Sequence, residues 1–206
     1  NNRYSYLYNN NNNWQDQIYE NSFVTNNLFR VEGGDAIAKY DLSLGYMNED
    51  GILKETSQER YHTQLNTNIL VSKKVEVFTT VGLAYMNGVF QEQGMQKQTN
   101  PILASYARSP LLSAWKSDID GRQIDELATY NYGISSNMDF AASNPLAIVK
   151  TLQATNRQYD VNILGGLIYN MTQNLALTGK AGLYYNYNQE NMFVPGVDNK
   201  SIVPLT

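Results

Sequence analysis

The stretch that decides the fold is Arg60 to Val71, RYHTQLNTNILV. Its side chains separate into two sets, because successive residues of a β-strand point to opposite faces. One face carries Tyr61, Thr63, Leu65, Thr67, Ile69 and Val71, and the other carries Arg60, His62, Gln64, Asn66 and Asn68. A strand with one apolar and one strongly polar face fits a soluble sheet. It also fits a barrel that has lipid outside and water inside.

The same alternation recurs along the chain and predicts six strands. We expect them near residues 27–33, 36–47, 60–71, 75–87, 157–171 and 174–188. The outward, apolar face should carry Leu42, Leu44, Leu65, Ile69, Val81, Leu83, Ile163, Leu167, Leu177 and Leu183. The gaps between strands run short, long, short, very long and short. Outer-membrane barrels alternate short periplasmic turns with longer outer loops, so one orientation of a barrel satisfies every gap.

Tyrosines mark the ends of the apolar faces. They are Tyr40, Tyr46, Tyr61, Tyr85, Tyr159, Tyr169, Tyr185 and Tyr187. Tyrosine is a favourable strand residue in any sheet, but aromatic girdles at the lipid headgroups also explain this placement. Together with the gap lengths, the tyrosines favour an all-β fold, an antiparallel up-and-down transmembrane β-barrel segment. Since a closed membrane barrel needs about eight strands, six strands indicate part of a larger barrel.

Composition excludes several kinds of function. The 206 residues include no cysteine, which excludes disulfides, zinc–thiolate sites and thiol nucleophiles. A net charge of -4 with no basic run gives no reason to expect a nucleic-acid partner. His62 is the single histidine, and no serine elbow or second ligand accompanies it. We therefore predict no catalytic residue, no metal site, no cofactor and no enzyme activity.

The two ends and the long central gap have their own character. The first twenty residues are rich in asparagine, which fits a solvated linker. No signal peptide is visible, and the chain stops abruptly at Thr206, so we expect a piece of a longer protein. In the irregular gap, residues 145–153 should form a short helix that begins after Asn144. Asp118 to Gly121 is faintly similar to a calcium loop, but a turn explains it better.

Short motifs spread over nearly the whole chain resemble one family. Trp14 to Tyr19 (WQDQIY) is similar to the segment that joins plug to barrel in SusC/RagA-type TonB-dependent outer-membrane transporters. The resemblance continues in order through residues 31–34, 40–46, 51–52, 59–61 and 65–66. The turn signals at residues 100–101, 109–110, 120–121 and 144–147 resemble the family's first large outer loop. Glu32 and Gln64 depart from the family pattern without altering the expected fold.

The resemblance implies an architecture and a function. It implies about six strands of a 22-stranded barrel, with a plug-to-barrel connecting segment at residues 1–26. Barrel strands would occupy residues 27–206, including a large extracellular loop at about 88–156. It further implies uptake of a glycan or peptide through the outer membrane of a Gram-negative bacterium of the Bacteroidota. The implied partners are outer-membrane lipid, a SusD-like lipoprotein and, through a region outside this chain, TonB.

Two other functions fit the sequence. One is a SusC-like structural scaffold in an outer-membrane assembly or secretion complex, and the other is a soluble carbohydrate-binding β-sandwich. In the long loop, the candidate contacts for substrate or partner are Tyr106, Trp115, Tyr130, Tyr132 and Phe140. Aromatic side chains among amides suit both sugar stacking and a protein interface. The competing interpretation is a loop that packs on itself over the barrel mouth.

Overall fold

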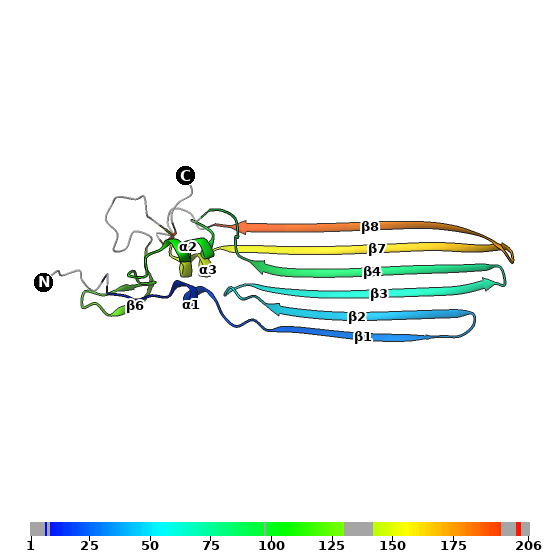
Figure 1. The fold of residues 1–206 in the computed structure, drawn as a ribbon, viewed down its shortest axis with the longest axis horizontal. Coiled ribbons are helices and arrows are strands. Elements are labelled where there is room, and N and C mark those ends of the chain that lie inside the picture. The colour runs from blue at the N-terminus through cyan, green and yellow to red at the C-terminus, as the bar shows by residue number, and fades with distance from the viewer. Residues whose placement is uncertain (1–6, 8, 97, 130–141, 195–200, 203–206) are drawn as a thin grey trace.

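The computed structural model describes residues 7, 9–96, 98–129, 142–194 and 201–202. Six long strands lie side by side, and short helices gather at one end of them (Figure 1). The strands are β1 (Val24–Gly34), β2 (Ala38–Asp50), β3 (Ser57–Ser72), β4 (Val75–Phe90), β7 (Gln153–Thr172) and β8 (Leu175–Phe193). No helix within the described ranges is long and apolar enough to cross a membrane.

The six strands form one antiparallel sheet in chain order, β1-β2-β3-β4-β7-β8. This confirms the predicted up-and-down topology. The strands are longer than predicted, since β7 already begins at Gln153 and β8 continues to Phe193. The strands therefore extend further toward the helical end than the alternating pattern alone indicates.

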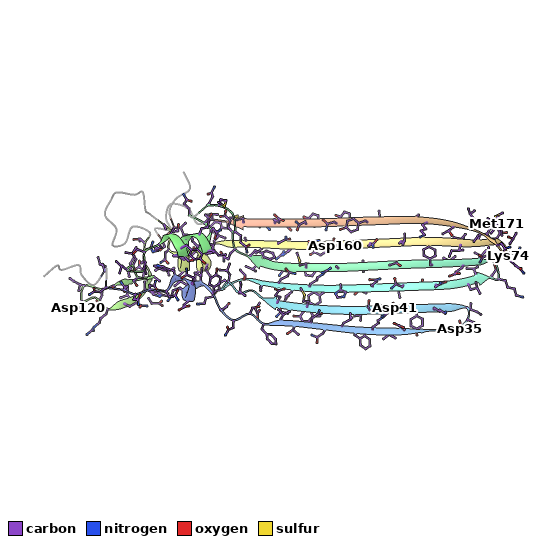
Figure 2. The ribbon with its side chains drawn as sticks, in the orientation of Figure 1. Asp35, Asp41, Lys74, Asp120, Asp160 and Met171 are labelled. Atoms are coloured by element: carbon purple, nitrogen blue, oxygen red, sulfur yellow. The ribbon has the colours of Figure 1, made fainter. Side chains whose placement is uncertain are left out.

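The three tight turns lie together at the end of the sheet opposite the helices, as predicted. Figure 2 shows Asp35, Lys74 and Met171 at this end and Asp120 at the other. In the first turn Gly34 adopts φ 139°, a conformation that favours glycine, and the backbone N–H of Asp35 donates to the Ala38 carbonyl at 2.8 Å. Each turn connects strands that pair directly with one another.

The strand register aligns apolar side chains into rows that run across the sheet. One row crosses all six strands through Val31, Leu42, Leu65, Val81, Ile163 and Leu183. On the polar face, two glycines allow rings to lie against a neighbouring strand. A Cβ added to Gly45 would clash with the His62 ring, and one added to Gly166 would clash with the Phe78 ring.

The helical end, called the cap here, consists of three helices, a hairpin and their connecting loops. The elements are α1 (Trp14–Ile18), α2 (Pro101–Ala107), β5 (Trp115–Ser117), β6 (Gln123–Leu127) and α3 (Pro145–Thr151). Each helix begins after an asparagine whose side chain accepts a backbone N–H, namely Asn13, Asn100 and Asn144. The helix predicted at 145–153 is confirmed as α3, although it ends at Thr151 and Gln153 already belongs to β7. Much of the gap predicted to be irregular is therefore folded.

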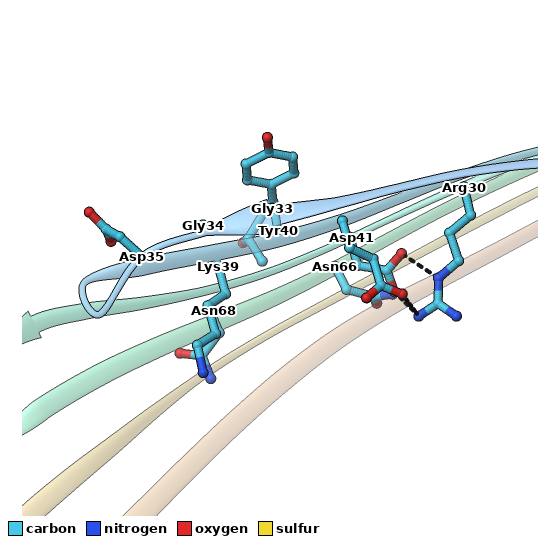
Figure 3. A pocket seen from close by; sticks show the side chains of 11 residues that line it. Arg30, Gly33, Gly34, Asp35, Lys39, Tyr40, Asp41, Asn66 and Asn68 are labelled. Atoms are coloured by element: carbon cyan, nitrogen blue, oxygen red, sulfur yellow. Dashed lines mark hydrogen bonds and ion pairs between the residues drawn. The ribbon is translucent and has the colours of Figure 1, made fainter.

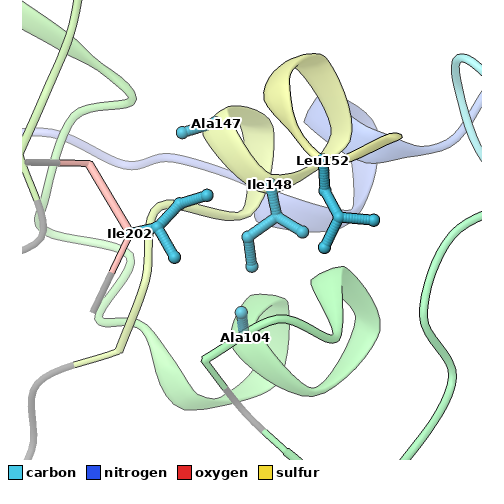
Figure 4. Packing of buried hydrophobic residues seen from close by; sticks show 5 residues of the cluster. All are labelled: Ala104, Ala147, Ile148, Leu152 and Ile202. Carbon is cyan, nitrogen blue, oxygen red and sulfur yellow. The ribbon is translucent and has the colours of Figure 1, made fainter. Parts of the chain in front are cut away.

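The hydrophobic core lies in the cap. Figure 4 shows one cluster, in which α2 and α3 pack with Ile202, and its members are Ala104, Ala147, Ile148, Leu152 and Ile202. Two further clusters include Trp14 and Ile18 of α1, which are 2% and 0% exposed. The solvated-linker interpretation is wrong for these two residues. Within the described part of the chain, none of the buried hydrophobic residues belongs to the six-stranded sheet.

Candidate functional site: two faces of the sheet and the cap

A row of tyrosines crosses the outward face near the cap. Tyr46, Tyr61, Tyr85, Tyr159 and Tyr187 come from five consecutive strands of the sheet and lie opposite one another in register. Their neighbouring ring centroids are 4.8 to 6.4 Å apart, within the range of favourable aromatic pairs. Such a row has the amphipathic rings that settle at a membrane–water interface.

The apolar part of this face extends from the tyrosine row to the turn end. On β4 it runs from Tyr85 to Val75, about 33 Å along a strand that rises about 3.3 Å per residue. Tilted as membrane strands are, that length spans about 25 Å, the height of the apolar band on outer-membrane barrels. Leu83 and Leu167, which lie in this zone on the inner strands β4 and β7, are 48% and 44% exposed. The face is therefore built for contact with lipid.

The outward side chains change character on the cap side of the tyrosine row. The next row in register is Asn48, Glu59, Asn87, Arg157 and Gln189. All five are polar. On the other side of the tyrosine row, toward the tight turns, the next outward row includes Leu44 and Leu83. This sharp change fixes the boundary of the apolar zone to within about two residues of the tyrosines.

The opposite face holds a network of charged and amide side chains. Arg30 donates through Nε and Nη2 to the two carboxylate oxygens of Asp41, each at 3.0 Å, and lies 2.7 Å from Glu32. Further along the sheet, Asp160 accepts from Asn186 at 2.6 Å, Gln158 at 2.9 Å and Tyr184 at 3.1 Å. These charges are largely exposed, and they pair with one another and with amides along the polar face of the sheet.

A cavity of about 560 Å³ lies on β1 to β3 near the turn end. Figure 3 shows Lys39, Asp41 and Asn68 on one side of the sheet and Tyr40 on the other. The cavity contains both charge signs, with Arg30 paired to Asp41 inside it. In the adjoining turn, the backbone N–H groups of Ala38 and Ile37 donate to Asp35 and lower the pKa of its carboxyl.

Metal-binding geometry is not found in the described ranges. No group of three or more His, Cys, Asp or Glu side chains converges there. Asp118 accepts hydrogen bonds from the backbone N–H groups of Asp120 at 2.9 Å and Arg122 at 2.8 Å. This is the geometry of a side-chain-stabilised turn, the interpretation that the sequence favoured.

The predicted contact residues fall in different places. Tyr106 lies on α2 and is 72% exposed, so its ring is available at the cap surface. Trp115 is half-buried on β5, packs beside the Trp14 cluster and has the Lys150 ammonium 4.7 Å from its ring centroid. Tyr130, Tyr132 and Phe140 lie outside the described residues. Trp115 therefore contributes to cap packing, and Tyr106 is the better candidate for a contact with a partner.

Sequence reasoning missed the pair that ties α1 to the rest of the cap. Trp14 donates from Nε1 to the Ser109 carbonyl at 3.0 Å, and the Arg108 guanidinium lies 5.3 Å above its ring. Arg108 also donates to the carbonyls of Ala142 at 2.7 Å and Thr129 at 3.2 Å. Burial lowers the pKa of Arg108 to about 10, so the side chain is still charged at neutral pH. The sequence feature that could have indicated this contact is Trp14, a large apolar residue directly after a run of asparagines.

Comparison with known proteins identifies relatives by sequence. No protein-family model matches the chain. TonB-dependent receptor P39 of Formosa agariphila is 26% identical over 193 residues, which cover 91% of this chain and 17% of the relative. TonB-dependent receptor P3 of the same organism is 26% identical over 116 residues, covering 52% and 11%. The chain thus spans less than a fifth of the length of these relatives, which are named as receptors and not as enzymes.

Solved structures agree on the fold. A structure of the RagAB peptide importer in its closed-closed state has a TM-score of 0.70 at 16% identity, over 95% of this chain and 21% of that chain. A second RagAB peptide transporter structure has a TM-score of 0.66 at 15% identity, over 89% and 20%. Relatives of this kind indicate the outer membrane of a Gram-negative bacterium. In sequence and in fold, the chain is similar to a barrel segment of SusC/RagA-type TonB-dependent receptors.

Proposed function

We propose that this chain forms part of the barrel wall of a TonB-dependent transporter that imports a glycan or peptide across the outer membrane of a member of the Bacteroidota. The observation that carries the proposal is the two-sided sheet. Its outward face is apolar up to a tyrosine row, and its other face is a network of charges and amides. A wall between lipid and a water-filled lumen needs both faces, and polar solutes pass along the second.

The proposed partner is a SusD-like lipoprotein that docks over the cap. Tyr106 and Leu111 supply exposed apolar contact area beside α2, at 72% and 52% exposure. The cap stands at the end of the sheet where the long loop lies, which in a transporter is the extracellular mouth. TonB would act through a region outside this chain, and the connecting role of residues 1–26 is part of the same proposal.

Transport is tested by uptake into energised cells that carry the full-length protein. Replacing Leu65 with Arg on the lipid face should lower the amount of folded protein in the outer membrane, and uptake should fall in proportion. If cells contain abundant, folded wild-type protein and still show no uptake, the result would favour the scaffold function instead. The β-sandwich alternative needs a second sheet packed on the first, whereas the described residues add only the β5–β6 hairpin.

Partner docking is tested by co-purification with point variants. Removing residues 100–140 would also remove α2, whose Ala104 is fully buried in the cap core, so a deletion cannot separate docking from folding. Tyr106→Asp combined with Leu111→Asp changes exposed side chains and should reduce recovery of the lipoprotein about tenfold or more. Met171→Asp, at the opposite end of the sheet, is the matched control and should leave recovery unchanged. Full recovery with the double variant would contradict docking at α2.

A further inference from the structure

One basic residue lies on the outward face of the six strands. The strand register places Arg157 of β7 there, in the first row on the cap side of the tyrosines. The other basic residues of these strands lie on the polar face, and they are Arg30, Lys39, Arg60 and Lys180. The outward face of the described strands therefore carries positive charge at one height only, just beyond the apolar zone.

This height is that of lipid headgroups. Arg157 lies two residues from Tyr159 along β7, about 7 Å at about 3.3 Å per residue. The headgroup regions of a bilayer extend about 5–7 Å beyond the hydrocarbon core on each side. Because tyrosine rings settle at the edge of that core, the Arg157 guanidinium lies at the level of the headgroups.

The side chains around Arg157 have unused hydrogen-bonding groups. Arg157 is exposed, and its guanidinium takes part in no hydrogen bond or ion pair with the residues that the structure describes. Its register partners, Asn87 on β4 and Gln189 on β8, likewise make no side-chain hydrogen bond to the described part of the chain. On the polar face, by contrast, Arg30 is paired with Asp41. The outward row thus directs a cation and two amides at something outside the sheet.

The chemistry of these three groups selects an anion with several oxygens. A guanidinium donates two parallel hydrogen bonds to a phosphate, and an amide N–H on either side can add another. Neighbouring strands are about 4.8 Å apart, so the amides of Asn87 and Gln189 flank a group held by Arg157.

The carboxylates of the outward face are too distant to neutralise Arg157. They are Glu59 on β3 and Asp50 on β2, two and three strands away in the sheet order. At about 4.8 Å per strand, the backbones are about 10 and 14 Å apart, beyond the screening length of about 8 Å at physiological salt. An anion at Arg157 therefore meets attraction from the arginine without close repulsion.

We infer that Arg157, Asn87 and Gln189 bind the phosphate of a lipid headgroup at the cap-side boundary of the apolar zone. The occupant is a lipid because the site is continuous with the apolar face, where Leu83 is 48% exposed and available to acyl chains. The inference rests on the proposed function in that it takes the outward face to be in contact with lipid. It concerns lipid binding only, so uptake can continue without it.

The test is native mass spectrometry of the full-length protein in detergent, titrated with lipid A, an acylated disaccharide that carries two phosphates, and with its dephosphorylated form. The phosphorylated lipid should bind about tenfold more tightly, as charged hydrogen bonds predict. Arg157→Gln should remove most of that difference and leave the affinity for the dephosphorylated lipid unchanged. Arg157→Lys keeps the charge but loses the two parallel donors, so its affinity should fall between the two.

The matched control is Arg60→Gln, which removes a guanidinium at nearly the same height but on the polar face. It should leave the affinity for lipid A unchanged, and so should millimolar inorganic phosphate in solution. An equal loss in Arg60→Gln, binding that depends on Lys74 in the tight turn in place of Arg157, or displacement of the lipid by inorganic phosphate would each overturn the inference.

The outcomes also separate this inference from the proposed function. If Leu65→Arg leaves the protein fully inserted in the membrane, the lipid-facing assignment fails and the lipid site fails with it. If Leu65→Arg impairs insertion as expected but Arg157→Gln binds lipid A as tightly as the wild type, only the lipid site is wrong.

Discussion

The cap and the sheet are stabilised in opposite ways. The cap buries Ile148 and Ala104 completely and closes three hydrophobic clusters within itself. None of the buried hydrophobic residues in the described part of the chain belongs to the six strands, and Leu83 on their outward face is 48% exposed. The cap therefore needs water around it, because burial from water drives its packing, whereas the sheet needs lipid on one face and further strands at both edges. One chain thus folds in two solvents.

The largest expected effect is on the cap core. Ile148→Ala should destabilise the cap by about 2–5 kcal/mol, because it removes a fully buried side chain that contacts α2. Hydrogen exchange in the full-length protein should show α2 and α3 opening more readily while β4 and β7 keep their protection. Ile69→Ala, on the half-exposed lipid face, is the control and should leave the cap unaffected. Equal loss of protection in both regions would mean that cap and sheet unfold as one unit.

A charge placed in the lipid zone tests the other half of the comparison. Leu65 lies in the apolar row that crosses all six strands, about 13 Å along the strand from Tyr61. Leu65→Arg should cost about 2–4 kcal/mol near mid-membrane. Asn66→Arg, one residue further on the polar face, should cost much less. Denaturant titration of folding into lipid vesicles compares the two, and a larger cost for Asn66→Arg would reverse the assignment of the faces.

The tyrosine row should contribute a smaller, local stabilisation. Tyr85 contacts both Tyr61 and Tyr159, and each aromatic pair contributes about 0.5–1.5 kcal/mol beyond its buried area. Tyr85→Ala should therefore destabilise the sheet in vesicles by about 1–3 kcal/mol. Tyr85→Phe keeps both ring contacts and should recover most of that loss. If the phenylalanine and alanine variants were equally unstable, the hydroxyl and not the ring row would be the stabilising feature.

The sequence predicts the sheet well, because its pattern is local. Alternation at Arg60 to Val71 assigns each side chain to a face without reference to any distant residue, and the gap lengths then order the strands. The cap could not be predicted in the same way. Its helices are five to seven residues long, too short to be stable alone, so tertiary contacts decide them. The asparagine–proline start of α3 was predicted as a helix, whereas the same start of α2 at Asn100 and Pro101 was interpreted as a turn.

The candidate site follows the same division. Tyr106 and Trp115 were predicted from residue type, but only the structure separates an exposed ring from a packed one. Arg108 bonds carbonyls at Thr129 and Ala142, and Gln91 bonds Val149, contacts between residues far apart in sequence. No periodic pattern encodes such pairings. The polar network around Asp160 was partly predictable, because alternation places Asp160 and Asn186 on the same face.

The smallest expected effect lies at the turn end, outside both the cap core and the lipid zone. Asp35 accepts backbone hydrogen bonds from Ile37 and Ala38 at 2.7 and 2.8 Å, which lower its pKa in the folded state. Because the pKa of Asp35 is lower in the folded state, its carboxylate stabilises the turn at pH values above its ordinary pKa of 3.8. This stabilisation is lost as the pH falls through the pKa of the folded state.

The measurement is a pH titration of the Asp35 carboxyl resonance in the full-length protein, together with the amide shifts of Ile37 and Ala38. All three should report one midpoint below 3.8, because one ionisation controls both hydrogen bonds. Asp35→Asn keeps an acceptor oxygen but cannot ionise, so its amide shifts should show no step over the same range. Because Asp35 is exposed, neither change should alter the protection of cap amides or the folding of the sheet into vesicles. A midpoint above 3.8 would mean that the turn does not hold its two hydrogen bonds in solution. A change in the protection of cap amides would show that the two ends of the sheet are coupled through the strands. That result would contradict the conclusion that the cap core and the lipid-facing sheet are stabilised separately.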